Sequence, residues 1–70
     1  MEDEELFAAF AERLREAHER VRALTVDEAE KASVSRRILV ISDAAKHDLG
    51  RANLRLLDLL EELDRRQRRA

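Results

Sequence analysis

Apolar residues in the first third of the chain recur at the spacing of an amphipathic helix. The steps between them are 3, 4, 3, 4 and 3 residues, along the series Phe7, Phe10, Leu14, Ala17, Val21 and Leu24. This alternation is the a/d seam of a coiled coil or helix bundle. Acidic residues fill positions 2–5, where they suit the positive end of a helix dipole. The pattern therefore predicts a first helix over about residues 3–24.

A signal for a second helix follows directly. Thr25 and Glu28 have the three-residue spacing of a capping box, in which the hydroxyl and the carboxylate satisfy free backbone N–H groups at the start of a helix. Leu24 stands where a hydrophobic staple would begin. We predict a very short turn near residue 25 and a new helix from about Val26, antiparallel to the first.

Apolar residues from position 34 onward keep the helical spacing without interruption. The series is Val34, Ile38, Ile41, Ala45, Leu49, Ala52, Leu56, Leu59 and Leu63. The stretch RRILVIS, residues 36–42, is rich in β-branched residues and would suit a strand. A lone strand would have nothing to pair with, which favours a helix. We therefore predict one continuous second helix over about residues 26–67.

This long helix needs partners for its second half, where Leu54, Leu57 and Leu60 widen the apolar stripe beyond one contact face. One solution is a break near Ser42 and Asp43, which would give a three-helix bundle. The stripe passes position 42 without a change of phase, which favours the other solution. The predicted fold is all-α, an antiparallel helical hairpin with a short first and a long second helix that assembles as a homodimeric four-helix bundle. The expected oligomer core is Phe7, Phe10, Leu14, Val21, Ile38, Ile41, Leu49, Leu56, Leu59 and Leu63.

Composition agrees with a single helical domain over residues 1–70. The chain has no proline, one glycine and no cysteine, so turn residues are scarce and no disulfide is possible. Its net charge is −2 with 43% charged residues, which makes nucleic acid an unlikely partner. The acidic start and the lack of a long apolar run predict a cytoplasmic protein without a membrane segment.

The stretch SDAAKHDLGR, residues 42–51, holds the candidate chemistry. On a continuous helix His47 faces away from the apolar stripe, with Asp43 one turn before it and Arg51 one turn after it. Gly50 removes a side chain next to the imidazole. The expected binding surface on this outer face is Val40, Asp43, His47, Gly50, Arg51 and Leu54.

The same residues permit a purely structural interpretation. Asp43, His47 and Arg51 would form an i,i+4 polar ladder on a solvated face, and Gly50 would let another helix approach closely. Asp43 and His47 have the spacing of a pair of metal ligands, but a stable site needs more than two. We therefore predict neither a metal nor a cofactor.

The letters HDLGR resemble two patterns around phosphorylated histidines, the H-x-L-K-G of histidine phosphotransfer domains and the H-D-L-R-T-P of sensor kinases. His47 and Leu49 match both patterns, and Asp48 matches the second. Gly50 and Arg51 stand in the opposite order to the first pattern, and no proline follows for the second. The resemblance implies a phosphorelay intermediate with a phosphohistidine at His47.

The sequence otherwise offers no catalytic group, because it has no cysteine, no glycine-rich phosphate loop and no serine with a plausible base. We therefore expect a non-catalytic regulator or adaptor that acts by protein–protein interaction. Its expected partners are a second copy of itself and another protein.

Overall fold

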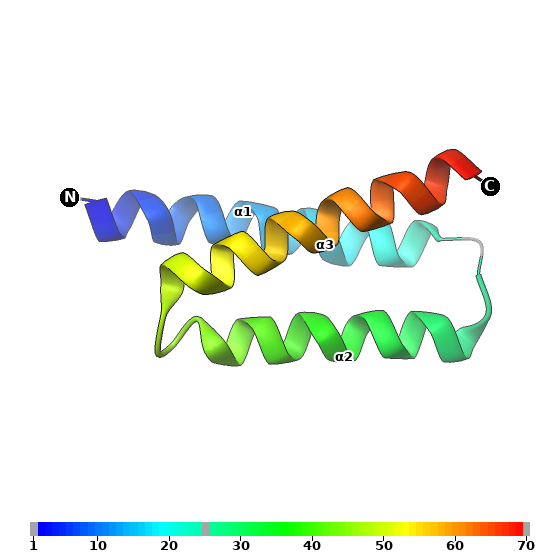
Figure 1. Cartoon of the computed structure of the whole chain (residues 1–70), viewed down its shortest axis with the longest axis horizontal. Coiled ribbons are helices and arrows are strands. Elements are labelled where there is room, and N and C mark those ends of the chain that lie inside the picture. Colours follow the sequence, from blue (N-terminus) through cyan, green and yellow to red (C-terminus); the bar gives the residue numbers. More distant parts are fainter. Residues whose placement is uncertain (1, 25, 70) are drawn as a thin grey trace.

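The computed structural model describes residues 2–24 and 26–69. Within them the chain forms α1 (Glu2–Ala23), α2 (Glu28–Ala44) and α3 (Leu49–Arg69). Helices α1 and α3 run in one direction and α2 runs in the opposite direction, so the two termini lie at opposite ends (Figure 1). The predicted all-α class is confirmed, and RRILVIS is part of a helix rather than a strand.

The prediction of one continuous second helix is wrong. The chain leaves the helix after Ala44 and begins another at Leu49, so the three-helix alternative describes it, with the break a few residues later than Ser42 and Asp43. Asp48 caps the new helix, since its Oδ1 accepts the N–H of Arg51 at 3.1 Å. The physical reason for the break is coverage: by folding back, α3 buries its apolar stripe against α1 and α2 of the same chain.

The start of α2 also differs from the prediction. Asp27 is the N-cap, and its Oδ1 accepts the N–H of Glu30 at 2.8 Å, so α2 begins at Glu28 rather than near Val26. A carboxylate is at least as good a cap as the hydroxyl of a threonine. The predicted cap, Thr25, lies outside the described residues. Helix α1 ends at Ala23, one residue before the predicted end.

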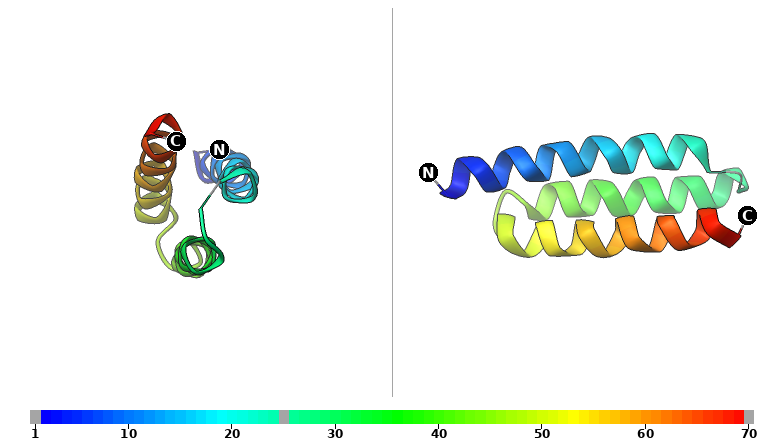
Figure 2. Two further views of the ribbon diagram at one scale, coloured as in Figure 1. Left: turned by 90° about the vertical axis from the view of Figure 1, so that its right-hand side faces the viewer. Right: turned by 90° about the horizontal axis from the view of Figure 1, so that it is seen from above.

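Seen end-on, the three helices stand at the corners of a triangle, and each packs against the other two (Figure 2). The core fills the space between them. Its buried apolar members are Phe10, Ala17, Val21 and Leu24 from α1 and the residue after it, Val34, Ile38 and Ile41 from α2, and Ala52, Leu56, Leu59, Leu60 and Leu63 from α3. Most of the residues expected in an oligomer core therefore lie in the core of one chain.

Three residues of the expected core are less buried. Leu14 and Leu49 are partly buried against the core, whereas Phe7 is 64% exposed in the single chain. The prediction assumed a helix running alongside α1 over its whole length. Instead α2 ends at Ala44, the chain reverses into α3, and the start of α1 projects beyond this turn (Figure 1). Phe7 therefore lacks the covering helix that the seam requires.

Candidate interaction surface

The structure separates the residues that we expected on one outer helix face. Asp43 lies near the end of α2, His47 lies in the turn, and Gly50 and Arg51 lie in the first turn of α3. Because the helix is interrupted between them, the predicted ladder of Asp43, His47 and Arg51 does not form as a run of helical neighbours. Asp43 instead has an exposed ion pair with Lys46 at 3.6 Å.

His47 is exposed, and its backbone N–H donates to the carbonyl of Ala44 at 3.0 Å. The open space that we expected at Gly50, next to the imidazole on one helix face, is not formed in this way, since Gly50 belongs to the next helix. Gly50 is exposed, and a Cβ added to it would have only Asp48 Oδ1 nearby, at 3.8 Å. No helix of the described chain approaches this glycine closely. The close helix contact that a structural role of Gly50 would require is therefore absent within the described residues of one chain.

Four large apolar side chains are exposed on the bundle. Val40 and Leu54 were expected on the surface, and they are 57% and 64% exposed. Leu39 is 65% exposed and Phe7 is 64% exposed. All four belong to the half of the bundle that contains the turn between α2 and α3 (Figure 1), namely the end of α2, the start of α3 and the start of α1. This half of the molecule therefore carries apolar surface that the chain itself leaves uncovered.

A groove of about 440 Å³ runs between α2 and α3 and includes one of these side chains. Val40 and Ile41 supply its apolar surface, and Arg36, Arg37 and Arg55 supply three guanidinium groups. Its other lining residues are Ser33 and Asp58. The groove combines apolar and cationic groups at one site, which is the chemistry of a binding surface for an amphipathic partner.

The arginines of this groove are not equivalent. Arg37 is held by Glu62 of α3, with its Nη1 2.6 Å from Oε2 of the glutamate. Arg36 and Arg55 are exposed, and neither has an ion pair with another residue of the described part of the chain. Two guanidinium groups therefore remain available to an acidic partner.

Sequence reasoning identified Val40 but missed the arginines. Arg36 stands four residues before Val40, so the two share a helix face, and this signal was present in the sequence. Arg55 joins them only because α3 folds back along α2. No local pattern predicts that approach.

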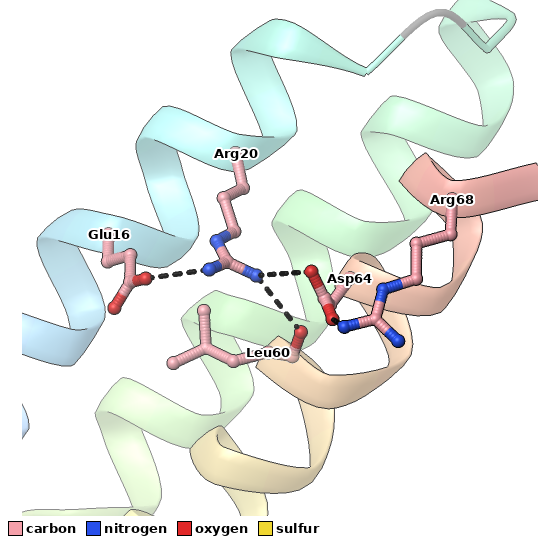
Figure 3. Close-up of polar contacts among 5 residues, drawn as sticks. All are labelled: Glu16, Arg20, Leu60, Asp64 and Arg68. Atoms are coloured by element: carbon pink, nitrogen blue, oxygen red, sulfur yellow. Dashed lines mark hydrogen bonds and ion pairs between the residues drawn. The ribbon is translucent and has the colours of Figure 1, made fainter. Parts of the chain in front are cut away.

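Polar contacts between α1 and α3 were also missed. Arg20 of α1 donates to the carbonyl of Leu60 at 3.4 Å and to Oε1 of Glu16 at 2.9 Å, and its Nη1 lies 3.8 Å from Asp64 (Figure 3). Asp64 also pairs with Arg68 at 3.0 Å. One turn of α1 is thus joined to two successive turns of α3 by polar contacts, which favour the observed alignment of the two helices.

A second polar contact lies deeper in the same interface. Arg13 Nη1 donates to Asn53 Oδ1 at 2.8 Å, and Asn53 is the buried polar residue of the core, 9% exposed. A buried amide needs such a partner, because an unpaired one carries its full desolvation cost. This contact is therefore structural and specifies the pairing of α1 with α3.

Neither a candidate metal site nor a helix that could span a membrane is present in the described part of the chain. Residues 2–24 and 26–69 contain no group of three or more side chains arranged to hold a metal ion. None of the described helices is long and apolar enough to cross a membrane. The chain matches no protein-family model, no curated protein and no solved structure.

Proposed function

We infer that this chain is a non-catalytic regulator or adaptor that binds another protein through the groove between α2 and α3. The observation that carries the proposal is the exposed Val40 beside Arg36 and Arg55, two arginines without an ion pair among the described residues. The partner with matching chemistry is an amphipathic helix whose apolar stripe is flanked by carboxylates. Its apolar side chains would cover Val40 and Ile41, and its carboxylates would meet the arginines.

Local charge favours this partner over a polyanion such as nucleic acid. The chain carries a net charge of −2, so its overall field does not attract an anionic ligand. Asp58 also lines the groove and would repel a dense run of phosphates. Arginine suits the carboxylates of a protein partner, because its planar guanidinium group forms two parallel hydrogen bonds to one carboxylate. A single helix in a groove of this size buries little area, which fits transient binding.

A designed peptide tests this proposal without knowledge of the natural partner. The probe is a fluorescent helix of roughly five turns with a leucine stripe flanked by glutamates, and its matched control has lysine in place of each glutamate. We expect fluorescence anisotropy to show binding of the acidic probe that weakens as salt is added, and much weaker binding of the basic one. Equal affinity for the two peptides would contradict the proposal.

Variants of the chain locate the binding. Arg55→Glu and Val40→Asp should each weaken binding of the acidic probe by about tenfold or more, since each removes a contact and adds a repulsive charge. Arg65→Glu and Leu39→Asp make the same changes at exposed positions that do not line this groove. These two controls should bind as the unaltered chain does. If they weaken binding as much as the first pair, the surface lies elsewhere.

Phosphotransfer through His47 is the second candidate, and the exposure of that residue in the turn is the observation in its favour. The test is to incubate the chain with a phosphorylated receiver domain. If His47 accepts phosphate, the chain should acquire an acid-labile phosphate, and the His47→Ala variant should not. If the unaltered chain takes up no phosphate, or if His47→Ala takes up as much, His47 is not a phosphate acceptor.

Homodimerisation is also a proposal, but the fold removes the reason that we inferred for it from the sequence. We expected a dimer because the leucine-rich half of a long helix would lack a partner within its own chain. In the closed three-helix chain most of that half is already covered, since Leu56, Leu59, Leu60 and Leu63 are buried. A dimer therefore has to arise from a different property of the molecule.

A further inference from the structure

The turn between α2 and α3 is built from nearly helical backbone. Ala45 and Asp48 keep four-residue hydrogen bonds, to Ile41 at 3.0 Å and Ala44 at 2.9 Å. Lys46 and His47 between them have three-residue bonds, and Ala45 has helical dihedral angles. No described residue has a positive φ, and residues 45–48 include neither proline nor glycine. Helix-type hydrogen bonding therefore continues up to the N–H of Asp48, and it resumes where Ala52 donates to the carbonyl of Asp48 at 3.0 Å, so the break is confined to a few residues at Asp48.

The apolar stripe is also continuous through the turn. Ile41, Ala45, Leu49 and Ala52 keep helical spacing, so straightening the turn would leave one apolar face from the start of α2 to the end of α3. The local contact that marks the break is the cap at Asp48, whose Oδ1 accepts the N–H of Arg51. Otherwise the break is maintained by the packing of α3 on α1 and α2 of its own chain.

We propose that the turn opens into a single helix over residues 28–69 and that two opened chains exchange their α3 helices to form a domain-swapped homodimer. Each α3 then packs on α1 and α2 of the second copy. The exchange remakes the contacts of α3 with α1 and α2 between the two copies, including Arg13 with Asn53 and Arg37 with Glu62, while α1 and α2 keep their contacts within each copy. This proposal goes beyond the binding of another protein and does not depend on it, because the groove between α2 and α3 exists in both forms.

Since the exchanged contacts cancel, the balance between the two forms depends on the turn and on contacts that exist only in the dimer. Gly50 favours the closed form, because in the open form it lies in the interior of a helix rather than in a first turn. Removal of the cap at Asp48 favours the open form.

The exposed apolar side chains lie where the new contacts form. In the swapped dimer the two long helices cross at their former turns. Phe7, Leu39 and Leu54 lie in the half of the bundle next to that turn (Figure 1), whereas Val40 lines the groove proposed for another protein. A lengthened α2 would also continue alongside the first turns of α1, where Phe7 now lacks a covering helix. The second copy therefore accounts for apolar surface that the closed chain leaves in water.

Sedimentation of cap variants tests the balance. Asp48→Ala should favour opening by about fivefold per chain, and so raise the dimerisation constant by roughly 25-fold, because two turns open in each dimer. Glu61→Ala is the matched control: it also removes one exposed carboxylate, but lies within α3 in both forms. The control should sediment as the unaltered chain does. A folded Asp48→Ala chain that stays as monomeric as the control would overturn the proposal.

Cross-linking shows whether any dimer is swapped, and it leaves the turn unaltered. The chain has no cysteine, so Arg37→Cys and Glu62→Cys can be prepared as separate single variants. These positions face each other from α2 and α3. After the two variants are unfolded and refolded together, a short bismaleimide should join Arg37→Cys of one copy to Glu62→Cys of the other in the dimer fraction.

In the control, both cysteine variants carry two glycines inserted between His47 and Asp48. The insertion interrupts the long helix of the open form, but in the closed chain it only lengthens the turn. The control should lose most of the mixed cross-link. A dimer fraction without the mixed cross-link, or a cross-link that the insertion leaves unchanged, would overturn the proposal.

Discussion

Removal of the Arg13 side chain is expected to destabilise the bundle far more than removal of a typical surface arginine. Arg13 donates to Oδ1 of Asn53 at 2.8 Å, and Asn53 is only 9% exposed. Arg13→Ala leaves the amide oxygen without this partner in the interface between α1 and α3. A hydrogen bond from a charged donor contributes roughly 1.5–3 kcal/mol, and partial access of water at the half-buried Arg13 reduces this to about 1–2 kcal/mol.

Urea unfolding followed by circular dichroism measures the loss of free energy directly. In a thermal scan, the same loss of about 1–2 kcal/mol should lower the melting temperature of a chain of this size by roughly 5–15 °C. Arg15→Ala is the control, since the Arg15 side chain is 72% exposed and its ion pair with Glu12 is 3.9 Å long. The control should stay within about 0.5 kcal/mol of the unaltered chain.

A double-mutant cycle separates the hydrogen bond from the packing of the arginine stem. Arg13→Ala combined with Asn53→Leu removes both polar partners, so the double variant should recover most of the stability lost in Arg13→Ala. If Arg13→Ala costs no more than Arg15→Ala, the buried amide does not depend on Arg13 and the reasoning is refuted.

Three other changes test the core, a cap and the glycine. Leu59 is fully buried, and Leu59→Ala should cost about 2–5 kcal/mol in urea unfolding; a loss below 1 kcal/mol would mean that α3 does not pack as described. Asp27→Ala should cost about 1 kcal/mol by removing the cap of α2, and an unchanged melting temperature would place that helix start elsewhere. Gly50→Ala should stabilise the chain by a few tenths to about 1 kcal/mol, because the added Cβ meets only Asp48 Oδ1 at 3.8 Å. A lower melting temperature for Gly50→Ala would show that a second chain packs against this glycine.

The helices themselves were predictable, because their apolar periodicity is local. Their ends were less so. The chain offers two caps with the same three-residue spacing, Thr25 before Glu28 and Asp27 before Glu30, and only the structure distinguishes them. The capping box favoured the threonine on sequence grounds, whereas the structure uses the aspartate.

The break between α2 and α3 was predicted only as the less favoured alternative, for a physical reason. Its turn uses no proline, no glycine and no positive φ, and the stripe through Ala45 and Leu49 keeps its phase. The chain folds back because the apolar face of α3 needs covering, which is a tertiary requirement. Asp48 before Leu49 was a local cue for the observed position of the break, as a possible N-cap.

The candidate site was predictable only in part. Exposure of Val40 and Leu54 followed from their positions relative to the stripe. The groove and the contact between Arg13 and Asn53 join residues far apart in the sequence, and therefore depend on the fold-back that periodicity did not reveal.

The most direct test of this account is the distance between the start of α2 and the end of α3 in a monomeric chain. Spin labels on Glu28→Cys and Arg65→Cys, two exposed positions, report it by pulsed electron resonance after dilution with unlabelled chain. In the closed bundle both positions lie at the same end (Figure 1), so the cross-section of 20 × 15 Å and the label arms set a short distance. A continuous helix would separate them by about 55 Å, at 1.5 Å per residue. We expect the short distance in the monomer; a monomer with the long distance would mean that α3 does not fold back along α2.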